Sequence, residues 1–529
     1  MSETTVGASG SRLDDWWGTL INTPARAKAW YWGGPLAVTL IAALLRFINL
    51  GTPHALVFDE TYYVKDAWTL WNNGYESAWK PGEADKAFTS GDVFAFTKDA
   101  SYVVHPQFGK WVIALGMAAF GPTNAFGWRF SVALAGVIAV WLIVIITRRL
   151  TGSTLLGVIA GGMMAIDGLA ITLSRVSVLD NILMLMALIG VYLMLLDRVW
   201  ARRRLHERVT AGKLAGKNYE WGPVLWWRPW LLLAAIAFGL ACGVKWSGLW
   251  FVVFFGIFTV IMDAVDRRRE GIPLFYSAAV LKQGPATLIT FVPLAAATYL
   301  ATWTSWILSS GGYMRNWMET HPEQQAHGAL SWIPLWLQNL WYYHQQMLGF
   351  HVGLSTPHPY QSNPLLWLVM QRPTSMWYQG SSAGQNGCTL TSCSEAINPI
   401  ANPVIWYAAV AALVYLIYRF IRYRNWQVGF VLMAVAAGYL PWMMYLHRTV
   451  FSFYSIVFEP YLIIGLAMTI GIILGSKNDP RDKRERRIAI VTAFGILAVL
   501  LSVFFYPLWT GEQIPLWYWQ MHMWVPSWV

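Results

Sequence analysis

The sequence predicts an all-α polytopic membrane protein, and its composition and hydropathy pattern both point to this class. Of the 529 residues, 56% are hydrophobic and only 12% are charged, and the mean hydropathy is +0.42. An ordinary soluble domain carries roughly a quarter charged residues. Apolar runs close to the ~20 residues that a helix needs to cross a bilayer recur along most of the chain. A soluble or disordered protein is therefore excluded.

The apolar runs predict about eleven membrane-spanning helices. We expect no removable signal peptide before them, because the N-terminal stretch is polar and carries Asp14 and Asp15. The chain divides into an N-terminal segment 1–34, a membrane domain 35–508 and a tail 509–529. The expected spans are 35–50, 128–146, 153–171, 177–196, 230–244, 247–262, 286–307, 403–418, 428–446, 455–474 and 488–505.

Clusters of Lys and Arg set the predicted orientation, because cytoplasmic loops carry an excess of both. The short basic loops all fall on one side if the N-terminus is cytoplasmic and the C-terminus lies outside. This topology of a multi-pass cell-membrane protein also accounts for the net charge of +11, so nucleic acid is not an expected partner. The basic loops are 148–149, 202–217, 267–269, 419–424 and 477–487.

Two long loops, 51–127 and 308–402, then lie outside the membrane. Both are rich in aromatic residues and proline, so we expect them to fold against the membrane. Within them, the apolar runs 111–120 and 330–347 are too short to span and predict helices that lie in the interface.

The cysteines agree with this topology. Cys388 and Cys393 both fall in the second outer loop, with no histidine close to them in that segment. An oxidising exterior favours a disulfide between them over a zinc site. Cys242 stands alone in an apolar run and is expected to be a core residue.

The first outer loop carries adjacent carboxylates, Asp59 and Glu60, directly after the first span. Such a pair near a membrane needs donors or cations close by. One interpretation is a solvated helix start, with Asp59 as the cap. The other is a site for a hydroxylated substrate, because Asp59, Tyr62, Tyr63 and Asp66 would share one helical face.

Several basic residues lie on the outer side, where the positive-inside bias gives no reason for them. Arg129, at the start of the second span, is expected to pair with Asp59 or Glu60. Lys110 is explained equally well by snorkelling to the headgroups. Arg175, Lys245 and Arg448 would form a phosphate or pyrophosphate pocket at headgroup depth if the bundle brings them together.

Other chemistries find little support in the sequence. It contains no Walker loop, no Rossmann glycine motif and no G-x-S-x-G elbow, so nucleotide binding and hydrolase chemistry are not indicated. Five histidines fall in the second outer loop without metal-ligand spacing, and we interpret most as ordinary loop residues. No metal site is predicted. These histidines are His321, His327, His344, His351 and His358.

The outer-loop motifs, taken in order, resemble those of the protein O-mannosyltransferase family. They are FDE at 58–60, HPQFGK at 105–110, SR at 174–175 with LD at 179–180, VKWSGL at 244–249, and HPYQS at 358–362 with RP at 372–373. The resemblance implies a GT-C type glycosyltransferase fold, a polyprenyl- or dolichyl-phosphate mannose donor and Ser/Thr hydroxyls of exported proteins as acceptors. It also implies inversion at the sugar carbon.

The chain departs from the family pattern in two places. The second outer loop lacks room for the β-trefoil MIR insertion of eukaryotic members, which suggests a compact bacterial version of actinobacterial type. Gln107 replaces the second proline usual in the His-Pro-Pro motif. The turn from Arg448 to Phe453 matches the family pattern only loosely.

The resemblance and the chemistry of lipid-phosphate transfer together assign roles. Asp59 is the expected general base, and Glu60 would orient the acceptor, the sugar or a nearby cation. The remaining candidates are Arg175, Lys245 and Arg448 for the donor phosphate, His105 for the acceptor path, Arg129 for bracing the catalytic loop, and Lys110, Asp180, Tyr360 and Gln361 for substrate contact or loop bracing.

Fixed cations can hold the leaving phosphate, so no cofactor is required, although a divalent cation is compatible with this chemistry. The expected partners are the donor lipid, membrane lipids and exported polypeptides, with the translocation machinery a further candidate.

Two alternatives share part of this evidence. A related glycosyltransferase that acts on a glycolipid or polysaccharide would have the same fold and the same kind of donor. A transporter would place charges through the middle of its spans and show internal repeats, whereas here the ionisable residues sit mostly at the outer ends.

Overall fold

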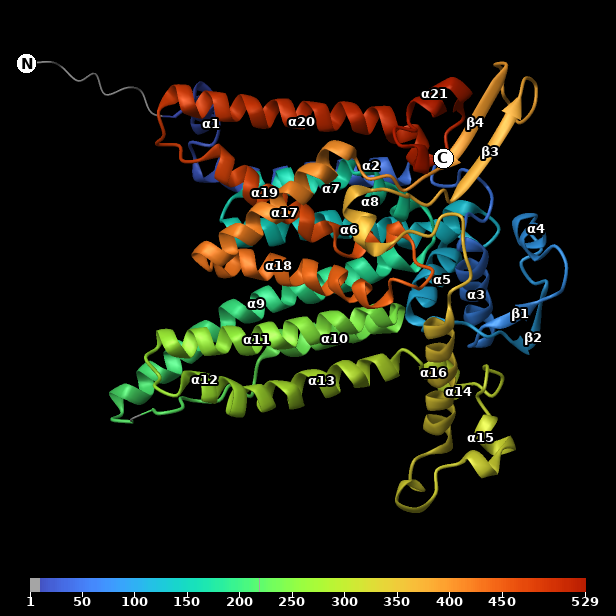
Figure 1. The fold of residues 1–529 in the computed structure, drawn as a ribbon, viewed down its shortest axis with the longest axis horizontal. Coiled ribbons are helices and arrows are strands. Elements are labelled where there is room, and N and C mark those ends of the chain that lie inside the picture. The colour runs from blue at the N-terminus through green and yellow to red at the C-terminus, as the bar shows by residue number, and fades with distance from the viewer. Residues whose placement is uncertain (1–9, 218) are drawn as a thin grey trace, which may run out of the picture.

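Each expected span contains a helix in the computed structural model, which describes residues 10–217 and 219–529. These helices form a bundle in which most axes run in a similar direction (Figure 1). The bundle helices are α2 (Pro24–Phe47), α6 (Ala125–Thr151), α7 (Thr154–Ile166), α8 (Gly168–Arg175), α9 (Leu179–Leu214), α10 (Pro229–Val244), α11 (Leu249–Arg269), α13 (Gly284–Ala301), α17 (Pro403–Tyr423), α18 (Trp426–Tyr439), α19 (Glu459–Leu474) and α20 (Arg481–Thr510).

The number of spans depends on how the shorter helices are treated. Within the described residues, 7 helices are long and apolar enough to cross a membrane, or 8 if the bent pair α7–α8 is one span. Helices α10 and α19 are apolar but shorter, and α2 falls outside both groups. The helical membrane architecture is confirmed for the bundle, and the two small sheets described below are the exception to an all-α chain. The count of about eleven spans stays a prediction.

The bend between α7 and α8 has a local cause at Asp167. Its side chain accepts the N–H of Leu169 at 2.9 Å and so caps α8, and the two helices meet at 59°. The second carboxylate oxygen accepts the N–H of Asn402 at 2.9 Å. Asp167 therefore joins the bent pair to the start of α17.

The two ends of the bundle differ in charge and in structure. Helix α1 (Arg12–Leu20) lies at one end, where Asp14 and Asp15 pair with Arg484 and Arg481 of α20 at 2.8 and 2.6 Å. The basic ends of α9 and α11 lie at this same end, and the C-terminus lies at the other (Figure 1). Residues 1–9 of the expected cytoplasmic segment lie outside the described part of the chain.

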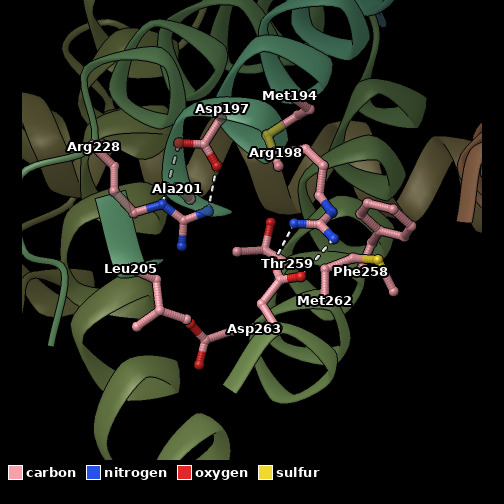
Figure 2. A pocket seen from close by; sticks show the side chains of 11 residues that line it. Met194, Asp197, Arg198, Ala201, Leu205, Arg228, Phe258, Thr259, Met262 and Asp263 are labelled. Carbon is pink, nitrogen blue, oxygen red and sulfur yellow. Dashed lines mark hydrogen bonds and ion pairs between the residues drawn. The ribbon is translucent and has the colours of Figure 1, made fainter. Parts of the chain in front are cut away.

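Buried ion pairs tie α9 and α11 together toward the basic end. Arg198 donates to Asp266 of α11 at 2.8 Å, and Arg228 donates to Asp197 at 3.2 Å (Figure 2). Arg267 pairs with Asp263 one helical turn away at 2.5 Å. Because every charge in this group has an opposite partner, we interpret the network as structural.

The outer loops and the C-terminal tail carry small folded elements at the far end of the bundle. Helix α16 lies across the ends of the bundle helices (Figure 1), as expected for an interfacial helix. The elements are α3 (Glu60–Asn73), β1 (Ser77–Trp79), α4 (Ala84–Thr89), β2 (Phe96–Ala100), α5 (Phe108–Phe120), α14 (Thr304–Leu308), α15 (Trp317–Thr320), α16 (Leu335–Gly353), β3 (Trp377–Ser382), β4 (Ser392–Ile397), β5 (Ile514–Pro515) and α21 (Leu516–Met521). The short helix α12 (Phe275–Ala278) precedes α13.

Two small antiparallel sheets stabilise this end. Strands β1 and β2 pair with Ser77 opposite Ala100, and a second sheet has the order β3-β4-β5. A disulfide joins Cys388 and Cys393 within the β3–β4 hairpin. Strand β5 pairs with β4, with Ser394 opposite Ile514, so the C-terminal tail is anchored to the second outer loop.

Candidate active site

Glu60 of the first outer loop is held by hydrogen bonds to both of its carboxylate oxygens. It is fully buried at the start of α3, and its two carboxylate oxygens accept four hydrogen bonds. Oε1 accepts from Arg129 Nε and the N–H of Ser177, and Oε2 accepts from Arg129 Nη2 and the N–H of Val57, each at 2.8 Å. This saturation leaves Glu60 no role in binding a substrate or the sugar. Of the expected roles, only that of orienting a cation fits.

Arg129 is the partner of Glu60, so the expected pairing with a loop carboxylate is confirmed. Its guanidinium also donates to the carbonyls of Pro53 and Ala55 at 2.9 and 3.0 Å. Arg129 lies near the start of α6 and thereby fixes the chain that leads into α3. This contact pattern supports the loop-bracing role expected for it.

Asp59 directly precedes α3 and is held by its strained neighbour. Phe58 has φ 51°, a left-handed conformation that is costly for a residue with a side chain. Its ring packs edge-to-face against Phe451 and His358 at 5.6 and 6.2 Å between ring centroids. The second outer loop and the last outer turn therefore both help to place Asp59.

The electrostatic environment of Asp59 suits a base. Burial raises the pKa of Asp59, the charge of Lys245 opposes this shift, the charge of Asp180 adds to it and a hydrogen bond with Tyr63 opposes it; the resulting pKa is about 6. A pKa just below neutrality keeps the carboxylate ionised but basic. Tyr62 is 64% exposed, so the expected shared face was wrong for this residue, and Tyr63 is the aromatic neighbour.

A cavity of ≈710 Å³ lies beside these groups, between the outer ends of the bundle and α16. Its wall is largely apolar and aromatic, with a polar group of side chains at one part of it. The polar lining includes His105, Asp180, Lys245, His344, His351 and Arg448. The sequence singled out four of these six, which lie far apart along the chain and meet here.

Lys245 and Asp180 form a buried pair in the cavity wall. Lys245 follows α10 directly, Asp180 lies in the first turn of α9, and their Nζ–Oδ2 distance is 2.7 Å. The rings of Tyr63 and Tyr454 lie 5.9 and 5.0 Å from the ammonium. One carboxylate satisfies only part of what an ammonium can donate, so Lys245 can still bind an anion.

Arg448 contributes the second cation of the cavity. Its Nη2 donates to His351 Nδ1 at 2.8 Å, whereas its buried Nε has no hydrogen-bond partner. A buried donor without a partner is costly and can be satisfied by a bound anion.

His105 lies in the same cavity wall as these cations. Burial together with Lys245 and His351 lowers the pKa of His105 well below its ordinary value. Its ring stacks on that of His351 with centroids 5.2 Å apart. A neutral ring lining the cavity fits the acceptor path expected for His105.

Lys110 lies outside the cavity and braces the first outer loop. Its ammonium forms a buried ion pair with Glu76, whose other oxygen accepts from Gln107 Nε2 at 2.8 Å. Gln107 in turn accepts from Ser305 Oγ at 2.9 Å. Snorkelling therefore does not explain Lys110, and Gln107 uses its amide where a proline would have no donor.

Arg175 does not reach the cavity, which corrects the expected phosphate role. Its guanidinium donates to the carbonyls of Arg46, Ile48 and Asn49 at 2.9, 2.7 and 2.9 Å. These carbonyls belong to the end of α2 and the residues after it, which have no helical partners. We therefore assign Arg175 to the packing of α8 on α2.

Tyr360 and Gln361 also lie outside the cavity lining. Gln361 Oε1 accepts the N–H of His358 at 3.2 Å, and the Tyr360 ring lies 5.5 Å from the Arg372 guanidinium. The N–H of Ser362 donates to Val450 at 2.8 Å. This turn therefore braces the aromatic cluster around Phe58, and substrate contact by Tyr360 or Gln361 is not supported.

His344 and His351 line the cavity from α16, so the interpretation of most second-loop histidines as ordinary loop residues does not hold for these two. His344 Nδ1 bonds the carbonyl of Leu340 at 2.7 Å, and its Nε2 is hydrogen-bonded to Tyr299. His344 and His351 are seven residues apart, which is about two helical turns, and this spacing places both on one face of α16. Within the described residues, no group of three or more His, Cys, Asp or Glu could hold a metal ion.

The fold is of the GT-C type, which is the fold of a class of polytopic membrane glycosyltransferases. The chain superposes with TM-score 0.68 and 14% identity on a chain of the S. cerevisiae protein O-mannosyltransferase Pmt1-Pmt2 complex bound to the sugar donor, over 99% of this chain and 95% of that chain. It superposes with TM-score 0.50 and 15% identity on the oligosaccharyltransferase AglB from Archaeoglobus fulgidus, over 92% of this chain and 56% of that chain.

The chain belongs to the dolichyl-phosphate-mannose-protein mannosyltransferase family. The family model matches residues 36–309, and that of the C-terminal four-transmembrane region of protein-O-mannosyltransferase matches 336–528. The polyprenol-phosphate-mannose–protein mannosyltransferase of Mycolicibacterium smegmatis is 33% identical over 95% of this chain and 93% of that protein. The Corynebacterium glutamicum protein of the same name is 30% identical, over 93% and 92%. The resemblance seen in the motifs is confirmed.

Proposed function

We propose that this chain transfers mannose from a polyprenyl-phosphate mannose donor to Ser/Thr hydroxyls of exported proteins, with inversion at the sugar carbon. The observation that carries the proposal is the meeting of Lys245 and Arg448 in a large apolar cavity beside Asp59. A lipid-linked sugar phosphate has the matching parts: an apolar chain, an anion and a sugar. The family's named activity supports the same conclusion.

The cavity wall suits the donor lipid. Leu249, Trp250, Val292, Trp341 and Leu348 line it from α11, α13 and α16. Of these, Leu249, Trp341 and Leu348 are more than half exposed on the surface. A polyprenyl chain can lie along this wall, with its phosphate at the cations.

The chemistry is a single displacement. The acceptor hydroxyl oxygen forms a bond to C1 of mannose while the bond from C1 to the phosphate oxygen breaks, and Asp59 takes the hydroxyl proton. Attack from the face opposite the phosphate inverts the carbon. Lys245 and Arg448 stabilise the negative charge that develops on the leaving polyprenyl phosphate.

We also propose that residues 35–508 form the catalytic domain and that its cavity opens on the outer face of the cell membrane. The N-terminal segment 1–34 would be cytoplasmic and the tail 509–529 outside. The charge difference between the bundle ends supports this orientation. Acceptors would then be polypeptides that have crossed the membrane, with the translocation machinery as a candidate partner.

The test uses the purified full chain, polyprenyl-phosphate mannose and a Ser/Thr-rich peptide, with mass spectrometry of the product. We expect one hexose on a peptide hydroxyl, and no transfer to a peptide with every Ser and Thr replaced by Ala. A parallel reaction with a glycolipid acceptor addresses the glycolipid alternative. Transfer to the glycolipid and not to the peptide would overturn the proposed acceptor class.

A further inference from the structure

His351 holds two hydrogen bonds that fix its tautomer. Its Nε2 bonds the carbonyl oxygen of Val104 at 2.7 Å and must carry the hydrogen, because a carbonyl only accepts. Its Nδ1 is then a free acceptor and takes the hydrogen bond from Arg448 Nη2 at 2.8 Å. The ring is therefore oriented to accept from Arg448 and from no other direction.

The surroundings keep this ring neutral and in place. Burial, with the charge of Arg448, lowers the pKa of His351 to about 4, so the Nδ1 lone pair stays available at neutral pH. His105 stacks on the ring with centroids 5.2 Å apart, and Trp246 meets it edge-on at 5.8 Å. These contacts make the imidazole a rigid acceptor at the cavity wall.

The backbone at Arg448 does not depend on this contact. Thr449 donates its N–H to the carbonyl of Leu354 at 3.2 Å and its hydroxyl to the carbonyl of Thr356 at 2.6 Å. These two bonds hold the turn against the end of α16 on their own. What His351 adds is a fixed direction for the long Arg448 side chain, through the hydrogen bond from Nη2 to His351 Nδ1.

We propose that His351 is a positioning residue that aims the Arg448 guanidinium at the donor phosphate. The inference rests on the proposed function and deepens it. His351 uses one nitrogen of the guanidinium and leaves the buried, unpartnered Nε and the remaining donors for the anion. A pre-oriented guanidinium loses less freedom when the phosphate binds, so the effect falls on donor binding more than on the chemical step.

Two substitutions separate the two hydrogen bonds of His351. In His351→Asn the side-chain carbonyl lies near the position of Nδ1 and can still accept from Arg448, but the bond to Val104 is lost. In His351→Gln the amide reaches the position of Nε2 and can still donate to Val104, but the acceptor for Arg448 is lost. We expect His351→Gln to raise the donor KM about tenfold with a smaller change in kcat, and His351→Asn to stay within about threefold of the wild type.

A double mutant tests whether the effect acts through Arg448. Arg448→Ala should raise the donor KM at least as much as His351→Gln, and His351→Gln should add less than twofold in that background. The control is His321→Gln. The ring of His321 stacks on that of Trp317, with ring centroids 3.6 Å apart, and His321 does not line the cavity. This variant should match the wild type in KM and in melting temperature.

Binding of polyprenyl phosphate to the purified chain gives a readout that does not need transfer. His351→Gln should weaken that binding about tenfold, even if the wild type transfers no mannose and the proposed function fails. An unchanged affinity in His351→Gln would overturn the inference. So would an equal loss in His351→Asn, or an effect of His351→Gln that is fully additive with Arg448→Ala.

Discussion

Amide substitution of the adjacent carboxylates Asp59 and Glu60 should affect different properties: the stability of the protein at Glu60 and its transfer activity at Asp59. Each carboxylate oxygen of Glu60 accepts two N–H hydrogen bonds. In Glu60→Gln an NH₂ group takes the place of one oxygen, so its N–H groups face two other N–H donors and cannot accept from them. Two charge-assisted bonds are lost, and the buried Arg129 keeps an uncompensated charge. The expected cost of Glu60→Gln is about 3–5 kcal/mol of folding free energy.

Asp59→Asn should behave differently, because burial raises the pKa of Asp59 and so disfavours its charged form. Its amide removes a charge that folding does not favour, and we expect no loss of stability. Loss of the general base should lower transfer by about 10²- to 10⁴-fold.

The assay pairs thermal unfolding of the detergent-purified protein with mannose transfer to a peptide. Glu60→Gln should unfold at a clearly lower temperature than the wild type, and Asp59→Asn at the wild-type temperature with little transfer. If Glu60→Gln had wild-type stability and a reduced kcat, the proposal that Glu60 and Arg129 brace the chain leading into α3 would be refuted. Near-full transfer by Asp59→Asn would show that Asp59 is not the general base.

Three further predictions follow from the same contacts. Since transfer needs the Asp59 carboxylate, kcat/KM should rise with pH with a midpoint of about 6 and level off above that midpoint. Lys245→Met should move the midpoint to higher pH, because it removes a positive charge that favours the carboxylate. A pH profile that is flat between 5 and 8 would contradict this. Arg175→Met should lower the melting temperature but keep the donor KM within about twofold, because Arg175 donates to backbone carbonyls and not to the donor. A large rise in donor KM at unchanged stability would instead indicate that Arg175 binds the donor phosphate. Replacing Cys388 and Cys393 by Ser should cost about 2 kcal/mol locally and speed proteolysis of the hairpin, with transfer unchanged; equal protease resistance of the variant and the wild type would contradict this.

The fold was predictable because membrane insertion depends on local sequence. An apolar run of sufficient length predicts a helix whatever the neighbouring sequence is, and the structure has a helix in each expected span. The interfacial helix α16 was predictable for the same reason, from a run too short to cross. The link from Asp167 to the start of α17 was not, because it is a contact with Asn402, 235 residues further along the chain.

The site was only partly predictable, because the direction of a side chain is a tertiary property. Lys245 and Arg175 have the same signature in sequence, a cation at the outer end of an apolar run. The structure turns Lys245 into the cavity and Arg175 onto the end of α2. Sequence could find Asp59 and Glu60 as a pair, but the four donors that separate their roles come from three different segments.

The most direct test of the account is a structure of the full chain with polyprenyl phosphate bound. The account predicts the phosphate within hydrogen-bonding distance of Lys245 Nζ and the Arg448 guanidinium, with the lipid chain along the wall between α11 and α16. A phosphate bound at Arg175, or anywhere outside this cavity, would contradict it.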